Sequence, residues 1–169
     1  KLYDSQWTDD LILEQRTFTD GKIIVIGRKA RRKKAKRFDY LLRYSQNFPI
    51  AIVEAKKKYK SDADGIQQAK DYAQILGLKF AYSTNGTEII EFDFITGLET
   101  KISNYPTPTD LWSRLNQAEP IKPEIQETFL KPFFATSGKE VRYYQRIAIN
   151  RAVKAVLEGK KRVLLTLAT

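Results

Sequence analysis

The stretch PIAIVEAKKK, Pro49 to Lys58, decides the fold because it joins an apolar strand pattern to a carboxylate and a run of lysines. Successive strand residues point to opposite faces of a sheet, so alternate positions of this strand share a face. One face therefore carries Ile50, Ile52, Glu54 and Lys56. The other carries Ala51, Val53 and Ala55, whose small size predicts close packing against a helix, 61–77. A solvated strand end and a metal-dependent active site both explain an acid at this position.

Strand and helix patterns surround this stretch on both sides. Segments 38–44 and 49–56 predict a hairpin, and 79–94 predicts a second hairpin turning at Asn85-Gly86. Segment 61–77 predicts a helix with Ile66, Ala69, Ala73 and Leu76 on its apolar stripe and Gly77 at its end. Two shorter strands are expected at 22–27 and 98–102. The pattern is that of a mixed α/β fold, a central sheet flanked by helices.

A block of positive charge follows the first expected strand. Segment RKARRKKAKR, 28–37, holds eight basic residues out of ten and no acid, in a chain whose net charge is +10. We expect an exposed loop that binds a polyanion, most simply double-stranded DNA, although a merely solvated loop has the same composition. The predicted DNA-binding residues are Arg28, Lys29, Arg31, Arg32, Lys33, Lys34, Lys36 and Arg37.

The chain contains no cysteine and no histidine. This excludes disulfides, Cys or His zinc sites, and catalysis by imidazole or thiolate. Any catalysis must use carboxylates, Lys, Tyr or Ser, with an oxygen-preferring cation such as Mg²⁺. No apolar run is long enough to span a bilayer, so we expect no membrane partner. The absence of cysteines fits a cytoplasmic location.

The register of the first hairpin decides whether two carboxylates meet. A four-residue loop, 45–48, would pair Tyr44 with Pro49 and place Asp39 directly opposite Glu54. A loop one residue shorter would put these two acids on opposite faces. Two like charges on facing strands are unfavourable unless a cation lies between them.

If the acids meet, we expect Asp39, Glu54 and the carbonyl of Ala55 to hold Mg²⁺ and Lys56 to orient the attacking water. The Glu-x-Lys spacing alone is not specific, because it recurs at Glu99–Lys101 and Glu158–Lys160. Chance occurrence in a charged protein is therefore the competing interpretation.

Gln68 and Tyr72 lie one helical turn apart, beside the apolar stripe of 61–77. An amide and a phenol both suit contact with DNA. The alternative is that Tyr72 is a core aromatic and Gln68 an ordinary surface residue.

Four motifs in order, RFDYLL, PIAIVEAKK, DADGIQQAKDYAQ and FAYSTNG, resemble the N-terminal nuclease domain of type I restriction enzyme R subunits, within the PD-(D/E)xK superfamily. The resemblance covers roughly 17–115 and implies a restriction-endonuclease-like core. It implies Asp39, Glu54 and Lys56 as the catalytic set, and Gln68 and Tyr72 as the family's Gln-x-x-x-Tyr motif, in DNA binding or coupling to the motor. The family's upstream helical acid has three candidates here, Asp9, Asp10 and Glu14.

The C-terminal part resembles the entry to a superfamily 2 helicase motor. VRYYQRIAI is similar to the element that reads adenine, which implies Gln145 as a nucleotide-binding residue, and RVLLTLAT resembles the strand before a Walker A loop. We therefore predict an endonuclease domain at 1–103, a Pro-rich helical connector at 104–138 and the beginning of a motor at 139–169. ATP would serve the full-length protein only, since the phosphate loop itself is absent from this chain.

The resemblance implies Mg²⁺-dependent endonuclease activity on DNA after ATP-driven translocation, in a complex with methylation and specificity subunits. A catalytically inactive nuclease fold that only binds DNA is one alternative. A subunit-docking module of a helicase-like protein is another, and a free-standing junction resolvase is a third, which the motor-like segment argues against.

Overall fold

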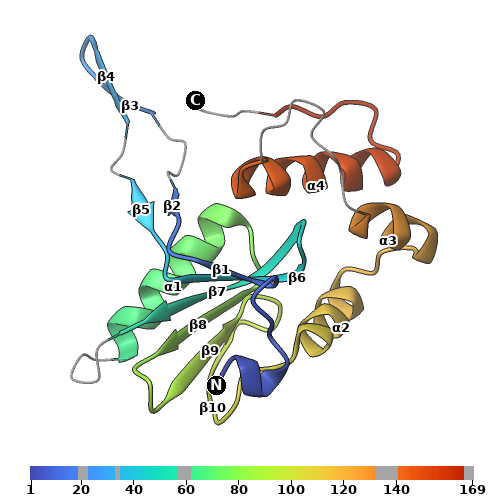
Figure 1. The fold of residues 1–169 in the computed structure, drawn as a ribbon. Coiled ribbons are helices and arrows are strands. Elements are labelled where there is room, and N and C mark those ends of the chain that lie inside the picture. The colour runs from blue at the N-terminus through green and yellow to red at the C-terminus, as the bar shows by residue number, and fades with distance from the viewer. Residues whose placement is uncertain (19–22, 33–34, 57–61, 132–140, 166–169) are drawn as a thin grey trace.

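A six-stranded mixed sheet forms the centre of the computed structural model, which describes residues 1–18, 23–32, 35–56, 62–131 and 141–165 (Figure 1). The strand order is β1-β6-β7-β8-β9-β10. Neighbouring strands are antiparallel except β7 and β8, which run parallel. The predicted mixed α/β fold is therefore confirmed. The six strands are β1 (Ile12–Glu14), β6 (Tyr40–Ser45), β7 (Phe48–Ala55), β8 (Phe80–Thr84), β9 (Ile89–Asp93) and β10 (Leu98–Ile102).

Helix α1 (Asp62–Leu76) connects the two parallel strands β7 and β8, as the parallel connection requires. Its apolar stripe is buried as predicted, and Gly77 ends it with φ +67°, a conformation that a residue with a Cβ adopts only with strain. The hairpin of β8 and β9 also forms as predicted. Its Asn85 side chain accepts hydrogen bonds from the backbone N–H groups of Thr87 and Glu88, both 2.9 Å long.

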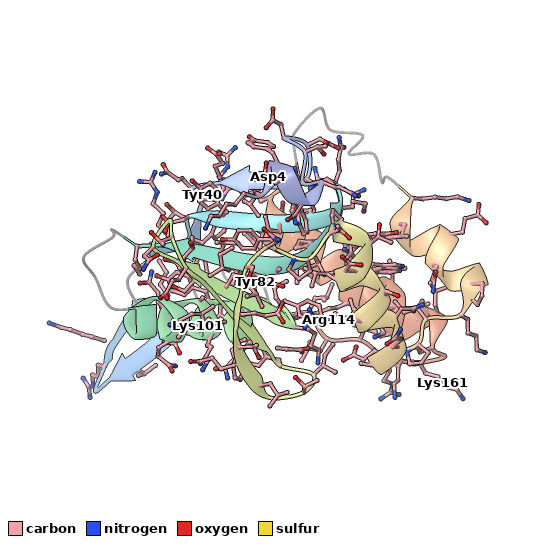
Figure 2. The ribbon with its side chains drawn as sticks, turned by 90° about the horizontal axis from the view of Figure 1, so that it is seen from below. Asp4, Tyr40, Tyr82, Lys101, Arg114 and Lys161 are labelled. Atoms are coloured by element: carbon pink, nitrogen blue, oxygen red, sulfur yellow. The ribbon has the colours of Figure 1, made fainter. Side chains whose placement is uncertain are left out.

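The two faces of the sheet are covered by different elements. Helix α2 (Pro108–Ala118) and the segment after the short helix η1 (Tyr3–Ser5) cover one face, where Trp7, Trp112 and Val53 share a core. Arg114 of α2 pairs with Glu91 at 2.9 Å and Asp93 at 2.7 Å, both on β9. The Tyr82 hydroxyl donates to Glu91 at 2.6 Å, and Figure 2 shows Tyr82 near the middle of the sheet and Arg114 on the helix beside it. This buried network fixes α2 to the sheet.

Helix α1 lies on the face opposite to the one predicted. Ile52 packs with the stripe of α1, whereas Val53 belongs to the core under α2. The physical reason is that the helix, rather than the strand, supplies the small residues, since Gly65, Ala69 and Ala73 are buried against the sheet. Helix α1 therefore covers the sheet face that carries Glu54, because Ile52 and Glu54 share a face.

Strands β6 and β7 form the expected hairpin, with a turn of two residues, Gln46 and Asn47, in place of four. The ladder pairs Ser45 with Phe48 and contains two compensating irregularities near Arg43, so the predicted pair of Tyr44 and Pro49 does not form. Beyond them Tyr40 pairs with Val53. The next position places Asp39 opposite Glu54, so the prediction about the acids is correct although the predicted loop is not.

The prediction of a loop for the basic block is wrong, because most of its described residues lie in strands. Strand β3 (Ile23–Ile26) pairs with β4 (Lys29–Arg32), and β2 (Thr17–Phe18) pairs with β5 (Lys36–Arg37). The turn at Gly27-Arg28 allows this, because Gly27 adopts φ +60° and the two strands can then satisfy each other's backbone groups. The β3–β4 hairpin extends away from the central sheet (Figure 1), and Lys33 and Lys34 lie outside the described residues.

The C-terminal elements are α3 (Pro123–Leu130), which lies in the predicted helical connector, and α4 (Tyr143–Leu157). Helix α4 lies against the β6–β7 turn and the end of α1, where Asn150 Nδ2 donates to the Asn47 carbonyl at 2.5 Å and Arg151 Nη2 to the Leu76 carbonyl at 2.9 Å. The predicted strand after α4 does not form over 162–165, because no described strand pairs with it. The proposed domain boundaries stay predictions. Within the described ranges, the helices are too short or too polar to cross a bilayer.

Candidate active site

Glu54 is a buried carboxylate near the end of β7, with only 1% of the residue exposed. Its Oε2 accepts a hydrogen bond of 2.7 Å from Gln68 Nε2 on α1. Its Oε1 is also buried and has no hydrogen-bond partner among the residues that the structure describes. An unpaired carboxylate oxygen in the interior is unfavourable, so this atom is a candidate ligand for a cation.

Burial and the neighbouring Asp39 raise the pKa of Glu54 to about 7, and the Lys56 ammonium opposes part of that rise. The carboxyl group is therefore near half-ionised at neutral pH unless further positive charge is supplied. A cation placed between the two acids would favour the ionised form of both.

Asp39 lies one residue before β6 and is held from two sides. The backbone N–H of Ala55 donates to its Oδ2 at 2.8 Å, and the N–H of Gln15 donates to its carbonyl at 2.8 Å. The bond from Ala55, the residue after Glu54, occupies one of the two carboxylate oxygens of Asp39. The structure therefore brings together the two acids that the sequence predicted, on adjacent strands.

Gln68 connects the remaining predicted residues to this pair. Lys56 Nζ donates to Gln68 Oε1 at 2.6 Å and lies 3.5 Å from Glu54 Oε2. Gln68 Nε2 also donates to the Tyr72 hydroxyl at 2.9 Å. The side-chain amide thus holds Lys56, Glu54 and Tyr72 at once, and the orientation of that amide follows from this network.

Tyr72 lies between this network and the basic strands. Its ring packs edge-on against Phe18 with centroids 4.9 Å apart, and Lys36 Nζ lies 5.3 Å from the ring centroid. Burial and the charge of Glu54 raise the pKa of its phenol. Tyr72 is buried, as the core interpretation predicted, but Gln68 is not an ordinary surface residue, because it bonds to Glu54, Lys56 and Tyr72. Contact of either residue with DNA stays a prediction.

Two site neighbours were missed by the sequence analysis. Ser83 on β8 is the register partner of Glu54, and its buried Oγ has no hydrogen-bond partner among the described residues. Gly65 on α1 approaches it so closely that a Cβ there would lie 2.1 Å from Ser83 Oγ and 2.9 Å from Lys56 Cγ. A glycine inside a helix and a serine inside an apolar strand were the available signals.

The donor set fits a hard divalent cation. It combines the free Oε1 of Glu54 with the neighbouring carboxylate of Asp39. The third candidate donor is the carbonyl of Ala55, which follows Glu54 in the chain and whose N–H bonds to Asp39. No cluster of three or more acidic, His or Cys side chains occurs within the described ranges, so the site offers two carboxylates. Asp9 and Asp10 lie in a turn and Glu14 in β1, so none of the three is the helical acid that was expected.

The predicted DNA-binding residues divide by location. Arg28 and Lys29 are exposed at the tip of the β3–β4 hairpin, whereas Lys36 lies beside Tyr72. Arg37 adjoins Gln15 through a side-chain hydrogen bond. Arg31 and Arg32 belong to β4.

Gln145 lies in the first turn of α4, where its Oε1 accepts the backbone N–H of Arg142 at 2.9 Å. The side chain therefore serves as a cap of the helix. Its role in nucleotide binding stays a prediction.

Comparison with known proteins decides the family. The family described as "Type I restriction enzyme R protein N terminus" matches residues 14–100, which include the whole Asp39, Glu54 and Lys56 constellation. The chain belongs to this family. The resemblance to the N terminus of type I restriction enzyme R subunits is thereby confirmed.

Two relatives of this R-protein family extend the similarity over nearly the whole chain. A type I restriction enzyme EcoAI endonuclease subunit from Escherichia coli is 33% identical over 181 residues, covering 99% of this chain and 22% of the relative. A solved fragment assigned to an HsdR subunit of a type I restriction enzyme from Vibrio vulnificus YJ016 is 54% identical, with a TM-score of 0.78. That match covers 98% of this chain and 32% of the solved chain. The present chain thus spans about a fifth to a third of the relatives it matches.

Proposed function

We propose that this R-protein N-terminal region is an endonuclease domain that hydrolyses DNA phosphodiester bonds with the help of Mg²⁺. The observation that carries the proposal is the buried Glu54, with one unpaired oxygen and a pKa raised to about 7 beside Asp39. A carboxylate that is unfavourable in isolation becomes favourable when a divalent cation binds, and functional sites concentrate such groups.

Asp39, Glu54 and the Ala55 carbonyl would hold the cation in this proposal. When bound, Mg²⁺ supplies a water of lowered pKa and stabilises charge on the phosphoryl oxygens. Asp39 is oriented for this role by the Ala55 N–H, and Glu54 by Gln68, so both acids are positioned before substrate arrives.

Lys56 is proposed to orient the attacking water and to stabilise negative charge that develops on phosphate. Its ammonium is directed by two acceptors, Gln68 Oε1 at 2.6 Å and Glu54 Oε2 at 3.5 Å. Its side chain remains 18% exposed, so a phosphate can approach it. An ammonium fixed in a mostly dry site acts more strongly on a developing charge than one in water.

The test uses the full-length R subunit assembled with its partner subunits and compares Lys56→Ala and Glu54→Gln with wild type. We expect Mg²⁺-dependent DNA cleavage to fall by about 100-fold or more, the usual effect of losing one such electrostatic contact, while DNA-stimulated ATPase stays unchanged.

The chain offers a matched control in a second Glu-x-Lys sequence. Lys101→Ala changes the lysine of Glu99–Lys101, which lies on β10, is 69% exposed and pairs with Glu88 on the surface. Cleavage by this variant should match wild type. Full cleavage by Lys56→Ala as well would contradict the proposal and favour an inactive nuclease fold that only binds DNA or docks a subunit.

The partners and the ATP requirement are proposed from the family. Methylation and specificity subunits, duplex DNA and ATP-driven translocation belong to the whole enzyme in this proposal. ATP is proposed to serve the full-length protein, with Gln145 of this chain as one candidate contact.

A further inference from the structure

The positive charge of the chain is concentrated in one segment of the sequence, and six of its basic residues lie in described strands or in the turn between them. Residues 22–37 hold nine basic residues and no acid, and the whole chain holds 30 basic and 20 acidic residues. This segment therefore supplies nine of the ten units of net positive charge. We call the strand pairs β2–β5 and β3–β4 the arm. The rest of the chain is nearly neutral, so attraction to a polyanion is strongest at the arm.

The outer part of the arm is a two-stranded ribbon. Ile26 pairs with Lys29 across the Gly27-Arg28 turn, and the described strands of this pair form a separate sheet. The tip residues Arg28 and Lys29 are exposed, and Val25 is 68% exposed. A ribbon of two strands, about 5 Å apart, fits the major groove of B-DNA, which is about 12 Å wide. There the basic residues would meet phosphates, and Val25 would meet sugars and base edges.

The inner part of the arm is fixed to the candidate active site. Phe18 of β2 packs against Phe38 at 5.9 Å and against Tyr72 at 4.9 Å, and both phenylalanines are buried. Lys36 of β5 lies over the Tyr72 ring. Tyr72 in turn bonds to Gln68, which holds Glu54 and Lys56. The base of the arm therefore forms one packed unit with the catalytic network.

The chain itself leads from the arm into the site. Strand β5 ends at Arg37, Phe38 is buried, and Asp39 follows at once. A duplex lying along the arm would therefore reach Asp39 where the arm joins the sheet.

We propose that the arm is a DNA-holding ribbon that lies in a groove of the duplex and directs a phosphodiester to Asp39 and Glu54. The inference rests on the proposed nuclease function and adds the surface by which duplex DNA reaches the site. In this arrangement Arg28 and Lys29 bind phosphates away from the cut, and Lys36 marks the entry to the catalytic network.

The experiment compares the double variant Arg28→Ala/Lys29→Ala with Lys160→Ala/Lys161→Ala in the full-length subunit with its partners. Both pairs are adjacent and exposed, and Figure 2 shows Lys161 across the molecule from the β3–β4 hairpin. Affinity for a duplex without a recognition site is measured over a series of salt concentrations. The slope of log K against log salt is negative, and the loss of two phosphate contacts should make it shallower by about 2. The control pair should leave the slope unchanged.

Cleavage provides the second readout. The arm variant should lose cleavage at moderate salt and regain it at low salt or high DNA concentration, because its catalytic residues are intact. An unchanged salt slope, or a loss shared equally by the control pair, would overturn the proposal. A normal slope with impaired assembly of the subunits would assign the arm to an acidic protein partner instead.

The failure of the arm proposal is distinguishable from failure of the nuclease proposal. Glu54→Gln should abolish cleavage at every salt concentration and leave the salt slope of binding unchanged. If Glu54→Gln cuts normally, the nuclease assignment fails. The salt slope of the arm variant then still tests whether the arm binds DNA.

Discussion

Gly65 on α1 and Ser83 on β8 lie so close together that a side chain at position 65 would force Ser83 or the helix to move. A Cβ on Gly65 would lie 2.1 Å from Ser83 Oγ. Because of this close contact, the first turns of α1 pack against the ends of β7 and β8. Gln68 can then bond to Glu54 and Lys56. The absence of one side chain therefore lets Gln68 reach the candidate catalytic residues Glu54 and Lys56.

The first prediction concerns this contact. Gly65→Ala should lower the free energy of unfolding by about 1–3 kcal/mol, because overpacking outweighs the gain in helix propensity. The measurement is urea unfolding of the 169-residue chain. Adding Ser83→Gly removes the nearest atom and should restore part of the loss, although Lys56 Cγ at 2.9 Å remains in contact. A Gly65→Ala chain as stable as wild type would show that α1 can move away without penalty.

The second prediction concerns pH and stability. Because the pKa of Glu54 is about 7 in the folded chain and 4.5 ordinarily, the folded state binds the proton more tightly. This contribution to stability is fully present below about pH 4.5 and is lost as the pH rises through 7, by at most about 3 kcal/mol. Glu54→Gln should therefore stabilise the metal-free chain more at pH 8 than at pH 5.

Thermal unfolding at these two pH values, without divalent ions, measures that difference. Glu88→Gln is a suitable control, because Glu88 pairs with Lys101 on the surface and should respond little to the change. Equal effects of Glu54→Gln at both pH values would contradict a raised pKa.

The third prediction links Mg²⁺ to the same proton. If the cation binds at Glu54, its binding at pH 7 should release about half a proton, since the carboxyl group is near half-protonated there. Calorimetric titration in buffers of different ionisation enthalpy counts the protons released. The apparent affinity should rise with pH up to about 7 and then level off. Proton release that persists in Glu54→Gln would place the cation elsewhere.

The fourth prediction concerns Gln68. Gln68→Ala leaves Lys56 without its 2.6 Å acceptor and Glu54 Oε2 without its amide donor. We expect a loss of about 1–3 kcal/mol in unfolding free energy and a marked loss of cleavage in the assembled enzyme. Gln67→Ala changes the neighbouring exposed glutamine, which bonds only to Asp71 among the described residues, and should change neither quantity much. Cleavage that survives in Gln68→Ala would show that Lys56 and Glu54 need no such support.

The fifth prediction concerns the attachment of α4. Asn150 is buried and donates to the Asn47 carbonyl at the β6–β7 turn. Asn150→Ala should leave that buried carbonyl unpaired, at a cost of about 1–3 kcal/mol, and should speed hydrogen exchange in the turn. Exchange measured by mass spectrometry distinguishes local loosening of the turn from a general loss of stability, which would also speed exchange in the central strands.

Much of the fold could be predicted from local sequence. Alternation and turn residues identified the β6–β7 and β8–β9 hairpins, and the apolar stripe of α1 identified the helix and its Gly77 end. The meeting of Asp39 and Glu54 depended only on an even number of residues in the loop between their strands. A two-residue turn and a four-residue loop therefore place the two acids on the same face. The strands of the basic block were not predicted, because the sequence of β4 is mostly charged and has no apolar alternation. This strand forms by pairing with β3.

What the sequence determined by itself is the set of chemical groups: two acids at adjacent strand ends, a lysine two residues later, a Gln and a Tyr one helical turn apart, and a concentrated positive charge. Periodicity and composition act over a few residues, so they determine these local features. Tertiary structure alone decided that α1 covers the face of Glu54 rather than that of Val53, and that Gln68 holds Glu54, Lys56 and Tyr72 together. Such contacts depend on which surfaces pack most closely across the whole chain, and here the small residues of α1 settled that choice.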